Sequence, residues 1–552
     1  MSLPRLCFFL LLAATAVSLT VLLAAVLAPG GWTIVKVLIL LCFIGVAPWL
    51  GVCVGNAVPG FFIRVLAARP ARTVLPVAGD IDHAPITART ALALTIRNEN
   101  MDAVLPPLGR LLAALAAAGF ADRFSPFILS DTADPALAAA EEAALAAFPH
   151  PVRYRRRRNN AGFKAGNVME FLDHHAEGFE FAVMLDADSE MSADAVLLLV
   201  RIMQAAPRMG IIQHLTVGRP ADSAFPRLFQ FGMRAGMRIW ATGQAFWQGD
   251  AGPYWGHNAI LRIAPFRQHC RLGPLADGSA ILSHDQVEAA RMRAAGWGVC
   301  LWAGEEGSTE ANPPGLPEFL RRDARWLAGN LQYRHLLALP GLRAMGRWQL
   351  VQAILLFTGA PLYVAMLALA ALSVATGGGQ AVERGTLLAF AAAWTLAIYS
   401  PKLLGYAEVL LFADRRARYG GAARFLAGAA AEFVFTLLLD ALSQLHKTLA
   451  MIRLALGARP GWLAQNRVVR GVGWGEAARM FWPHTAFGVV VFAAFTCASW
   501  DAVLWALPFA GGLLVAIPFC VLSADPRVSA GLRQRAIAAV PEEGTAPPRR
   551  RN

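Results

Sequence analysis

Long apolar runs without charged residues constrain this chain more than any other feature of its sequence. Residues 6–27 and 33–58 form two such runs, and each is long enough to cross about 30 Å of hydrocarbon as a helix. Lys36, near the start of the second run, can extend its ammonium group to the membrane interface. Further apolar runs occupy residues 351–374, 386–412, 486–499 and 502–521. We therefore predict about six transmembrane helices.

The composition agrees with a membrane protein. The 552 residues are 56% hydrophobic and 16% charged, whereas about 25% of residues are charged in average globular proteins. This balance excludes a wholly soluble enzyme, a disordered chain and a collagen-like fibre. The net charge of +13 could suggest nucleic acid, but basic residues collect in the cytoplasmic loops of membrane proteins, so we expect no nucleic-acid partner. The seven cysteines show no CxxC spacing and indicate neither a zinc site nor a disulfide framework.

The distribution of arginine predicts the orientation in the membrane. The link at residues 30–32 carries no charge, whereas Arg64, Arg69 and Arg72 follow the second run. By the positive-inside rule, the link is external and the chain after residue 58 begins in the cytoplasm. The first run exceeds the roughly 7–15 apolar residues of a signal peptide, so we interpret it as a transmembrane helix. We expect a multi-pass protein of the bacterial inner membrane with both termini in the cytoplasm.

Composition shifts divide the chain into seven segments. Residues 432–456 are interrupted by Asp440, His446 and Lys447, so we interpret them as an interfacial or re-entrant helix. The predicted segments are two transmembrane helices (1–58), an interfacial linker (59–90), a cytoplasmic catalytic domain (91–340), a transmembrane hairpin (341–412), interfacial or re-entrant helices and loops (413–483), a second transmembrane hairpin (484–523) and a basic disordered tail (524–552).

Within the cytoplasmic domain, short apolar strands alternate with helices. Residues 91–96, 127–129, 181–185 and 211–213 are the strand candidates, and Ala/Leu-rich helical stretches such as 104–118 separate them. This alternation predicts an α/β fold with a mostly parallel sheet and right-handed crossovers.

Three of these strands end in acidic residues. Asn98 and Glu99 follow the first, Asp131 follows the second, and Asp186 and Asp188 follow the third. The carboxyl ends of parallel strands lie on one edge, where ligands bind, so we expect these groups to converge. Four carboxylates repel one another unless a cation compensates, and oxygen ligands favour Mg²⁺ or Mn²⁺ carried by a nucleotide diphosphate. Asp186 and Asp188 are the predicted metal ligands.

A second DxD motif, Asp80 and Asp82, follows no apolar strand, so we interpret it as part of a solvated linker. Lys164 and Asn167 come just before a helical stretch and suit a phosphate or a sugar hydroxyl, with an ordinary capping turn as the alternative. The arginine run 155–158 could meet a diphosphate or anionic head groups, but we expect a solvated cytoplasmic loop.

Two further motifs carry chemistry. Asp285, in Ser283-His284-Asp285, is either a helix N-cap or a general base, and His284 beside it is a helix-start histidine or, less favoured, a metal ligand. Arg322, Arg325 and Trp326 precede the next apolar run. Guanidinium groups can clamp a leaving diphosphate and an indole can stack on a sugar, although an amphipathic interface segment would look the same.

The order of these motifs resembles that of membrane-embedded, processive family 2 glycosyltransferases. Cellulose-synthase-like members carry Thr-Glu-Asp and Gln-x-x-Arg-Trp where this chain has Ser283-His284-Asp285 and Arg322 to Trp326, which argues against cellulose synthase. A closer resemblance is to the glucans biosynthesis glucosyltransferase H family of osmoregulated periplasmic glucan synthesis. The strings that carry it are LSDT (129–132), YRRRR (154–158), LDADS (185–189), YWGHNAI (254–260), ILSHD (281–285), AAGWGV (294–299) and RWLAGNL (325–331).

That resemblance implies a GT-A-like fold and a function. It implies UDP-glucose as the donor, Mg²⁺ or Mn²⁺ as the cofactor, and a linear β-1,2-glucan passed through the lipid bilayer, with a periplasmic glucan-processing partner. Asp131 would bind the nucleotide and Asp285 would be the base. Tyr254, Trp255, His257 and Asn258 would lie near the acceptor. The alternatives are another β-glucan synthase, a glycosyltransferase acting on a lipid carrier, and a transporter with a nucleotide-sensing domain.

Overall fold

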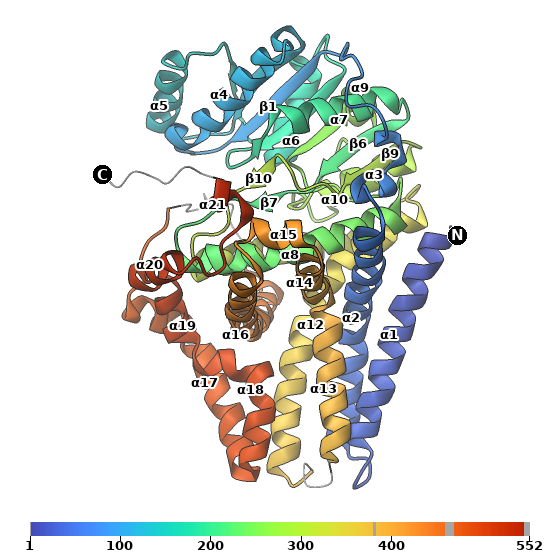
Figure 1. Cartoon of the computed structure of the whole chain (residues 1–552), viewed down its shortest axis with the longest axis vertical. Helices are drawn as coiled ribbons and strands as arrows, with labels where there is room; N and C mark the ends of the chain where they lie inside the picture. The colour runs from blue at the N-terminus through green and yellow to red at the C-terminus, as the bar shows by residue number, and fades with distance from the viewer. Residues whose placement is uncertain (1, 379–381, 459–467, 546–552) are drawn as a thin grey trace.

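The computed structural model describes residues 2–378, 382–458 and 468–545. Figure 1 shows an α/β domain above a bundle of long helices that extends downward from it. Among the described residues, five helices are long and apolar enough to cross a membrane, or up to seven spans if each of two bent pairs counts as one. The five are α1 (Leu3–Leu27), α2 (Ile34–Leu66), α12 (Ala344–Ala375), α16 (Ala422–Ala455) and α17 (Trp474–Ala498).

Two of the apolar runs form bent pairs of helices. Residues 386–412 form α13 (Arg384–Ile398) and α14 (Ser400–Leu411), which meet at 74°, and α18 (Trp500–Leu514) meets α19 (Ala516–Ser523) at 61°. Pro401 lies in the first turn of α14, where it lacks an N–H and cannot continue the preceding helix. The predicted apolar span over 386–412 is therefore broken in the middle, and whether it crosses the membrane stays a prediction.

Helix α16 contains the segment expected to be interfacial or re-entrant. Its length and apolar content would allow it to cross a membrane. In Figure 1, however, α16 is seen end-on, whereas α1, α2, α12 and α13 run vertically. It packs against α8, α12 and α18. The number of spans therefore stays a prediction.

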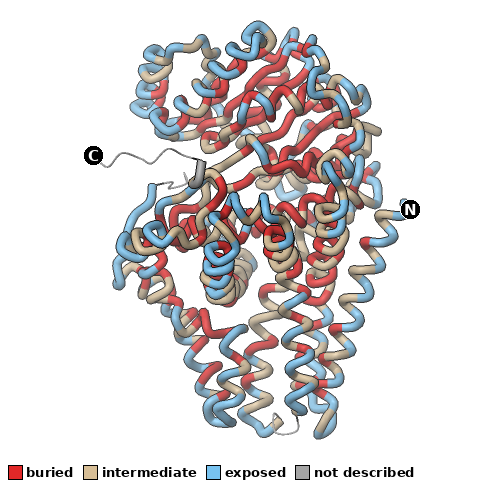
Figure 2. The backbone as a smooth tube through the Cα atoms, in the orientation of Figure 1, coloured by how far each residue is buried: buried red, intermediate tan, exposed pale blue. Residues whose placement is uncertain are grey.

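Burial along the vertical helices fits a lipid environment. Figure 2 shows many exposed residues on the outer faces of the lower bundle and mainly buried residues in the sheet domain above. Leu10, Val17 and Leu41 are among the apolar side chains that α1 and α2 leave exposed. Apolar side chains on the outside of a long apolar helix are stable in hydrocarbon but not in water.

The upper domain contains the expected mixed, mostly parallel sheet. Seven strands lie in the order β3-β2-β1-β4-β8-β6-β9, and β8 alone among them runs antiparallel to its neighbours. The strands are β1 (Thr90–Ile96), β2 (Phe124–Ser130), β3 (Arg153–Arg156), β4 (Phe181–Asp186), β6 (Met209–His214), β8 (Ala259–Arg262) and β9 (Gly298–Trp302). A small sheet of β5 (Glu190–Met191), β7 (Val217–Gly218) and β10 (Ser308–Glu310) lies beside the carboxyl end of β4.

Helices cover both faces of the large sheet. Alternate residues of β1 point to opposite faces: Leu92 and Leu94 pack with α4 (Met101–Ala117) and α7 (Ala193–Ala205), while Ala91 and Ala93 face the opposite core. That second core includes side chains of α6 (Phe163–His174), α9 (Ile263–His269) and α10 (Asp285–Ala294). Burial on both faces explains why these strands read as continuous apolar runs. The remaining helices of this part are α3 (Pro70–Val74), α5 (Pro135–Ala146) and α11 (Leu316–Gln332).

Helix α8 (Ala224–Gln248) joins the two parts of the molecule. Arg238 of α8 lies 3.4 Å from Glu305, in the loop after β9, and 3.3 Å from Glu408 of α14. Arg64 of α2 also pairs with Glu408, at 2.6 Å. All four side chains are largely buried, so this ion network holds the sheet domain against the helices of the lower bundle.

The C-terminal segment is ordered over part of the length predicted to be disordered. It forms α20 (Pro526–Gln534) and α21 (Pro541–Thr545). The short helix α15 (Ala413–Arg418) belongs to the bundle. Arg227 and Arg234 of α8 bind Glu543 and Glu542, at 2.7 Å in each case. These ion pairs to buried arginines fix the segment, so the prediction of disorder is wrong for residues 526–534 and 541–543. Residues 546–552 lie outside the described part of the chain.

Glycines set the close crossing of α2 and α8. A Cβ added at Gly243 would lie 1.9 Å from the backbone oxygen of Asn56, and one added at Gly60 would lie 2.0 Å from that of Ile239. Gly243→Ala should therefore push α8 away from α2 and cost about 1–3 kcal/mol of stability, seen as a lower melting temperature in detergent. Gly359→Ala in α12 is the matched control, because a Cβ there meets no atom within 4 Å. Equal melting temperatures for both variants would contradict this account.

Candidate active site

The carboxyl ends of β1, β2 and β4 meet at one edge of the sheet, as the sequence predicts. Ile96 is in register with Ser130 of β2, and Thr95 is in register with Asp186 of β4. The Thr95 hydroxyl donates to Asp186 Oδ1 at 3.0 Å, and the backbone N–H of Asn98 donates to Thr132 Oγ1 at 2.7 Å. Asn98 has a left-handed φ of 57° and is exposed, and the next residue, Glu99, is half-buried.

Asp131 lies at this edge, buried in a pair with Arg157. Arg157 Nε and Nη2 donate to the two carboxylate oxygens of Asp131 at 2.7 and 2.6 Å. Arg157 also donates to the backbone oxygens of Ala161 and Phe163, at 3.0 and 2.9 Å. The expectation that residues 155–158 form a solvated loop is therefore wrong for Arg157. Arg155 and Arg156 end β3, and a carboxylate at the end of the neighbouring strand draws the guanidinium of Arg157 inward.

Lys164 and Asp186 form an ion pair across the same edge. The ammonium of Lys164, in the first turn of α6, donates to Asp186 Oδ1. Burial would raise the pKa of Asp186, but the charges of Lys164 and His257 and the hydrogen bonds from Lys164 and Thr95 lower it to about 2. Asp186 is thus an anion over the whole physiological range, with a cation already beside it.

Asn167, the other predicted residue of this turn, has a positioning role within the fold. Its side-chain amide donates to the backbone oxygen of Leu129 at 3.1 Å, and its Oδ1 accepts from Arg155 at 2.7 Å. Asn167 is buried, so it holds the start of α6 against β2.

Asp186 and Asp188 could together hold a divalent cation. The backbone N–H of Asp186 donates to Ser189 Oγ at 3.0 Å and that of Ser189 donates to Asp186 O at 2.9 Å, which closes a tight turn around Asp188. No group of three or more His, Cys, Asp and Glu side chains in the described ranges could hold a metal ion by itself. Two carboxylates nevertheless suit Mg²⁺, which proteins commonly bind through one or two carboxylates and substrate phosphates.

Asp285 reaches the same site through Gly256. Gly256 has a left-handed φ of 81°, and a Cβ added to it would lie 3.6 Å from Asp285 Cβ, 3.7 Å from Lys164 Nζ and 3.8 Å from His284 Cε1. Asp285 and Lys164 therefore both approach the one point that a side chain of residue 256 would occupy, and glycine leaves it open.

Asp285 is the first residue of α10, and His284 occupies the N-cap position. Burial raises the pKa of Asp285, Glu288 raises it further, and the charges of His284 and Lys164 oppose the rise. His284 Nδ1 lies 2.9 Å from Glu288 Oε2, and this partner raises the pKa of His284 against the effect of burial. A carboxylate with a raised pKa at the edge of a ligand site is suited to accept a proton.

Only some side chains of the segment 254–258 are accessible. Trp255 and His257 are half-buried, whereas Tyr254 and Asn258 are fully buried. Asn258 Nδ2 donates to Ser308 Oγ at 2.9 Å, which anchors the segment to β10. Packing and β10 occupy the side chains of Tyr254 and Asn258 in this structure, and the place of this segment near an acceptor stays a prediction.

Glu310 is a site residue that the sequence analysis missed. It ends β10, and its Oε2 lies 3.5 Å from Nε2 of His257. Burial raises the pKa of Glu310, Asp188 and Asp186 raise it further, and His257 and Arg322 lower it. Glu310 therefore lies among the metal-ligand candidates and the arginine helix. The strand that Glu310 ends, β10, has three residues and is too short to be recognised from its sequence pattern.

Helix α11 brings the predicted arginine–tryptophan motif to this side of the domain. The Arg322 guanidinium carbon lies 4.5 Å from the centre of the Trp326 ring, and Trp326 is half exposed. Arg322 Nε is buried and makes no hydrogen bond, so it can still donate to a ligand. Arg325 is half-buried on the same helix. Asp323 points the other way, 3.4 Å from Lys447 of α16.

The Asp131–Arg157 pair yields a test of this geometry. Arg157→Gln leaves the Asp131 carboxylate buried without its partner, which typically costs about 3–5 kcal/mol. We expect a clearly lower melting temperature in detergent. Arg158→Gln is the matched control, because Arg158 is exposed and should leave the melting temperature unchanged. If both variants had the melting temperature of the wild type, the Asp131–Arg157 pair would not contribute to stability.

Comparison with known proteins places this site in a family. A family model described as glycosyl transferase family group 2 matches residues 181–402. Glucans biosynthesis glucosyltransferase H of Pseudomonas putida is 33% identical over 536 residues, which cover 92% of this chain and 61% of the relative. The enzyme of that name from Caulobacter vibrioides is 32% identical over 511 residues, which cover 88% of this chain and 77% of the relative.

A solved structure also matches, more distantly. It is the mannosyltransferase PcManGT from Pyrobaculum calidifontis in complex with GDP-Man and Mn²⁺, at 16% identity and a TM-score of 0.38, over 64% of this chain and 99% of that one. The two sequence relatives extend along most of this chain, through both the sheet domain and the helices. The chain belongs to the glucans biosynthesis glucosyltransferase H family.

Proposed function

We propose that this protein is a processive, inverting glucosyltransferase of the bacterial inner membrane. It uses UDP-glucose to build the linear β-1,2-glucan backbone of osmoregulated periplasmic glucans and passes the chain across the membrane. The observation that carries this proposal is the approach of Asp285 to the Lys164–Asp186 pair at the ligand-binding edge of the sheet. The chain spans 61% of the length of its Pseudomonas relatives, whose name indicates glucosyl transfer in glucan synthesis.

The donor binds along the carboxyl ends of β1, β2 and β4. Asn98 and Glu99, with the Asp131–Arg157 pair, bind the nucleoside end. Asp186 and Asp188 hold Mg²⁺ or Mn²⁺, which when bound offsets negative charge on the leaving diphosphate. Because Asp186 is paired with Lys164, donor binding moves this ammonium from the carboxylate to a phosphate oxygen. The site therefore exchanges one set of charge partners for another.

Transfer needs a base on the acceptor side. Asp285 takes the proton of the acceptor hydroxyl, whose oxygen bonds to the anomeric carbon of glucose. The bond from that carbon to the diphosphate oxygen breaks on the opposite face, so the configuration inverts and UDP leaves with the electron pair. The raised pKa of Asp285 suits a proton acceptor, because the carboxylate is more basic than an ordinary aspartate.

Helix α11 serves the leaving group and the acceptor. Arg322 has a buried Nε without a hydrogen bond, and its guanidinium is held on the Trp326 ring. Arg322 and Arg325 stabilise the departing diphosphate, and the half-exposed Trp326 stacks on an acceptor sugar. Glu310 and His257 lie between α11 and the metal ligands and position both sides of the reaction.

A cavity of about 400 Å³ in the helical bundle supports passage of the product. Residues of α2, α8, α12, α14 and α16 line it, including Trp49, Trp240 and Lys402. Tryptophan rings and charged groups match the apolar faces and hydroxyls of a glucan. Lys447 lines the same cavity and contacts Asp323 of α11, next to the proposed acceptor site.

The direct test is synthesis by the purified protein. In liposomes with labelled UDP-glucose and Mg²⁺, we expect a polymer whose linkage analysis gives β-1,2 bonds. Asp285→Asn should abolish incorporation while donor binding stays within about two-fold, because the donor is held by other groups. Asp277→Asn is the matched control, since Asp277 is an exposed aspartate of the preceding loop and should leave synthesis unchanged.

Each other outcome of this experiment has a definite meaning. A different linkage would point to another β-glucan synthase, and a single glucose on an added lipid carrier would point to a lipid-linked glycosyltransferase. Full turnover by Asp285→Asn would exclude Asp285 as the base. Absence of any product with donor binding intact would contradict the proposed transferase activity.

The pH dependence tests the environment of Asp285. Since the charge of His284 lowers the pKa of Asp285, His284→Asn should raise that pKa. A base must be ionised, so the acid limb of the rate profile should move to higher pH, measured as UDP release at saturating donor. The exposed His83 provides the control variant, His83→Asn, which should leave the profile unchanged. A shift of the acid limb to lower pH would contradict the argument.

A further inference from the structure

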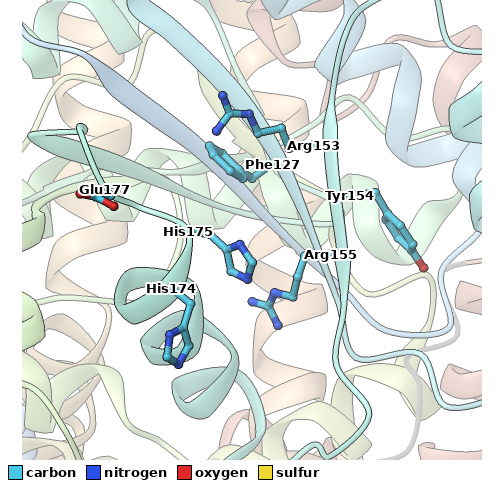
Figure 3. Close-up of a pocket in the computed structure, with 7 residues that line it drawn as sticks. All are labelled: Phe127, Arg153, Tyr154, Arg155, His174, His175 and Glu177. Carbon is cyan, nitrogen blue, oxygen red and sulfur yellow. The ribbon is translucent and has the colours of Figure 1, made fainter.

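A second cavity, of about 330 Å³, opens beside the edge strand β3. Figure 3 shows its lining: Arg153 and Arg155 project from one face of β3, Phe127 comes from the neighbouring strand, and His174 and His175 come from the end of α6. Tyr154 points away from them in Figure 3, and its hydroxyl donates to Glu141 at 2.9 Å. Two guanidiniums and two imidazoles thus converge on one space, and the guanidiniums supply its positive charge, because burial and the charge of Arg155 lower the pKa of His175.

Arg155 has hydrogen-bonding capacity to spare in this cavity. Its Nη2 donates to the backbone oxygen and Oδ1 of Asn167, at 3.0 and 2.7 Å. Its Nε and Nη1 are buried and make no hydrogen bond, although a carboxylate oxygen of Glu170 lies 3.6 Å from Nη1. Buried donors without an acceptor are costly, so an anion entering the cavity gains from satisfying them.

The other lining groups favour an anion as well. The Arg153 guanidinium carbon lies 5.3 Å from the centre of the Phe127 ring, which holds this charge at the wall of the cavity. In Figure 3 the ring of His175 points toward Arg155. Glu177 is acidic, but it is exposed on the turn after α6 and lies apart from the arginines in the same view.

This cavity lies away from the proposed donor site. Helix α6 starts at the carboxyl end of β3, near Lys164, and returns along the sheet before β4 begins. His174 and His175 at its far end therefore lie toward the amino ends of the strands, opposite the edge that carries Asp131 and Asp186. None of the residues that line this cavity belongs to the proposed donor site.

We infer that this cavity binds a phosphate group. Planar guanidiniums hold phosphate oxygens through paired hydrogen bonds, and histidines add donors at the same distance range. A phosphate bound there would engage Arg155, which also holds Asn167 at the start of α6, next to Lys164. Occupancy therefore acts on the start of the helix that carries the donor-site lysine, through Arg155 and Asn167. The phosphate can be free or part of a nucleotide.

Equilibrium dialysis with labelled inorganic phosphate tests this inference on the full chain in nanodiscs of zwitterionic lipid. We expect saturable binding that weakens about ten-fold or more in Arg153→Gln and in Arg155→Gln, as for the loss of one charge-assisted hydrogen bond. Arg153 is exposed and makes no structural hydrogen bond in the described part of the chain, so its variant should fold even if Arg155→Gln does not. Arg156→Gln is the matched control and should bind like the wild type, because Arg156 follows Arg155 in β3 and side chains alternate between the two faces of a strand.

A donor-site variant separates this cavity from the proposed active site. Phosphate binding should persist in Lys164→Gln combined with Asp188→Asn. The same series with labelled UDP distinguishes the sources: UDP binding that survives the donor-site changes and falls in Arg153→Gln assigns the cavity to a nucleotide phosphate. Binding of neither probe, or binding lost with the donor-site changes and kept in Arg153→Gln, would overturn the inference.

Discussion

Carboxylates gathered on one sheet edge must be neutralised, and this constraint organises the site. The acids at two strand ends each have a cation as partner, Arg157 for Asp131 and Lys164 for Asp186, and the imidazole of His257 lies beside Glu310. Without those partners, mutual repulsion and burial would oppose folding of the edge. The same pairs make the site ready for an anionic ligand, since every cation that neutralises a carboxylate can turn to a phosphate.

The junction between the sheet domain and the helical bundle is also formed by buried ion pairs. Arg238 of α8 lies between Glu305, from the sheet domain, and Glu408, from the bundle. Burial would raise the pKa of Glu305, but Arg238 and Arg234 lower it to about 2, so the carboxylate stays charged. Breaking such a buried pair leaves an isolated charge, which makes the relative placement of the two parts specific.

The sequence predicted the parts of the fold that depend on local pattern. Apolar strands followed by acids gave the parallel sheet and the meeting of Asp131 with Asp186, because both follow from strand direction alone. It did not predict β8, whose four residues pair antiparallel, or the bend before Pro401, although that proline is a local signal for it. It missed Glu310, and the burial of Arg157 and Asn258, because these side chains find their partners only in the folded chain.

The pairing of α8 with the C-terminal segment has a consequence for biosynthesis. Arg227 and Arg234 find their acidic partners 316 and 308 residues further along the chain. Until a ribosome has made those glutamates, Arg227 lacks its acidic partner, and Arg234 has Glu305, at 3.4 Å, but not yet Glu542. Final assembly of the junction must therefore follow translation and insertion of the last bundle helices. Fusion of a bulky tag close behind residue 543 would act on that late step rather than on folding of the sheet.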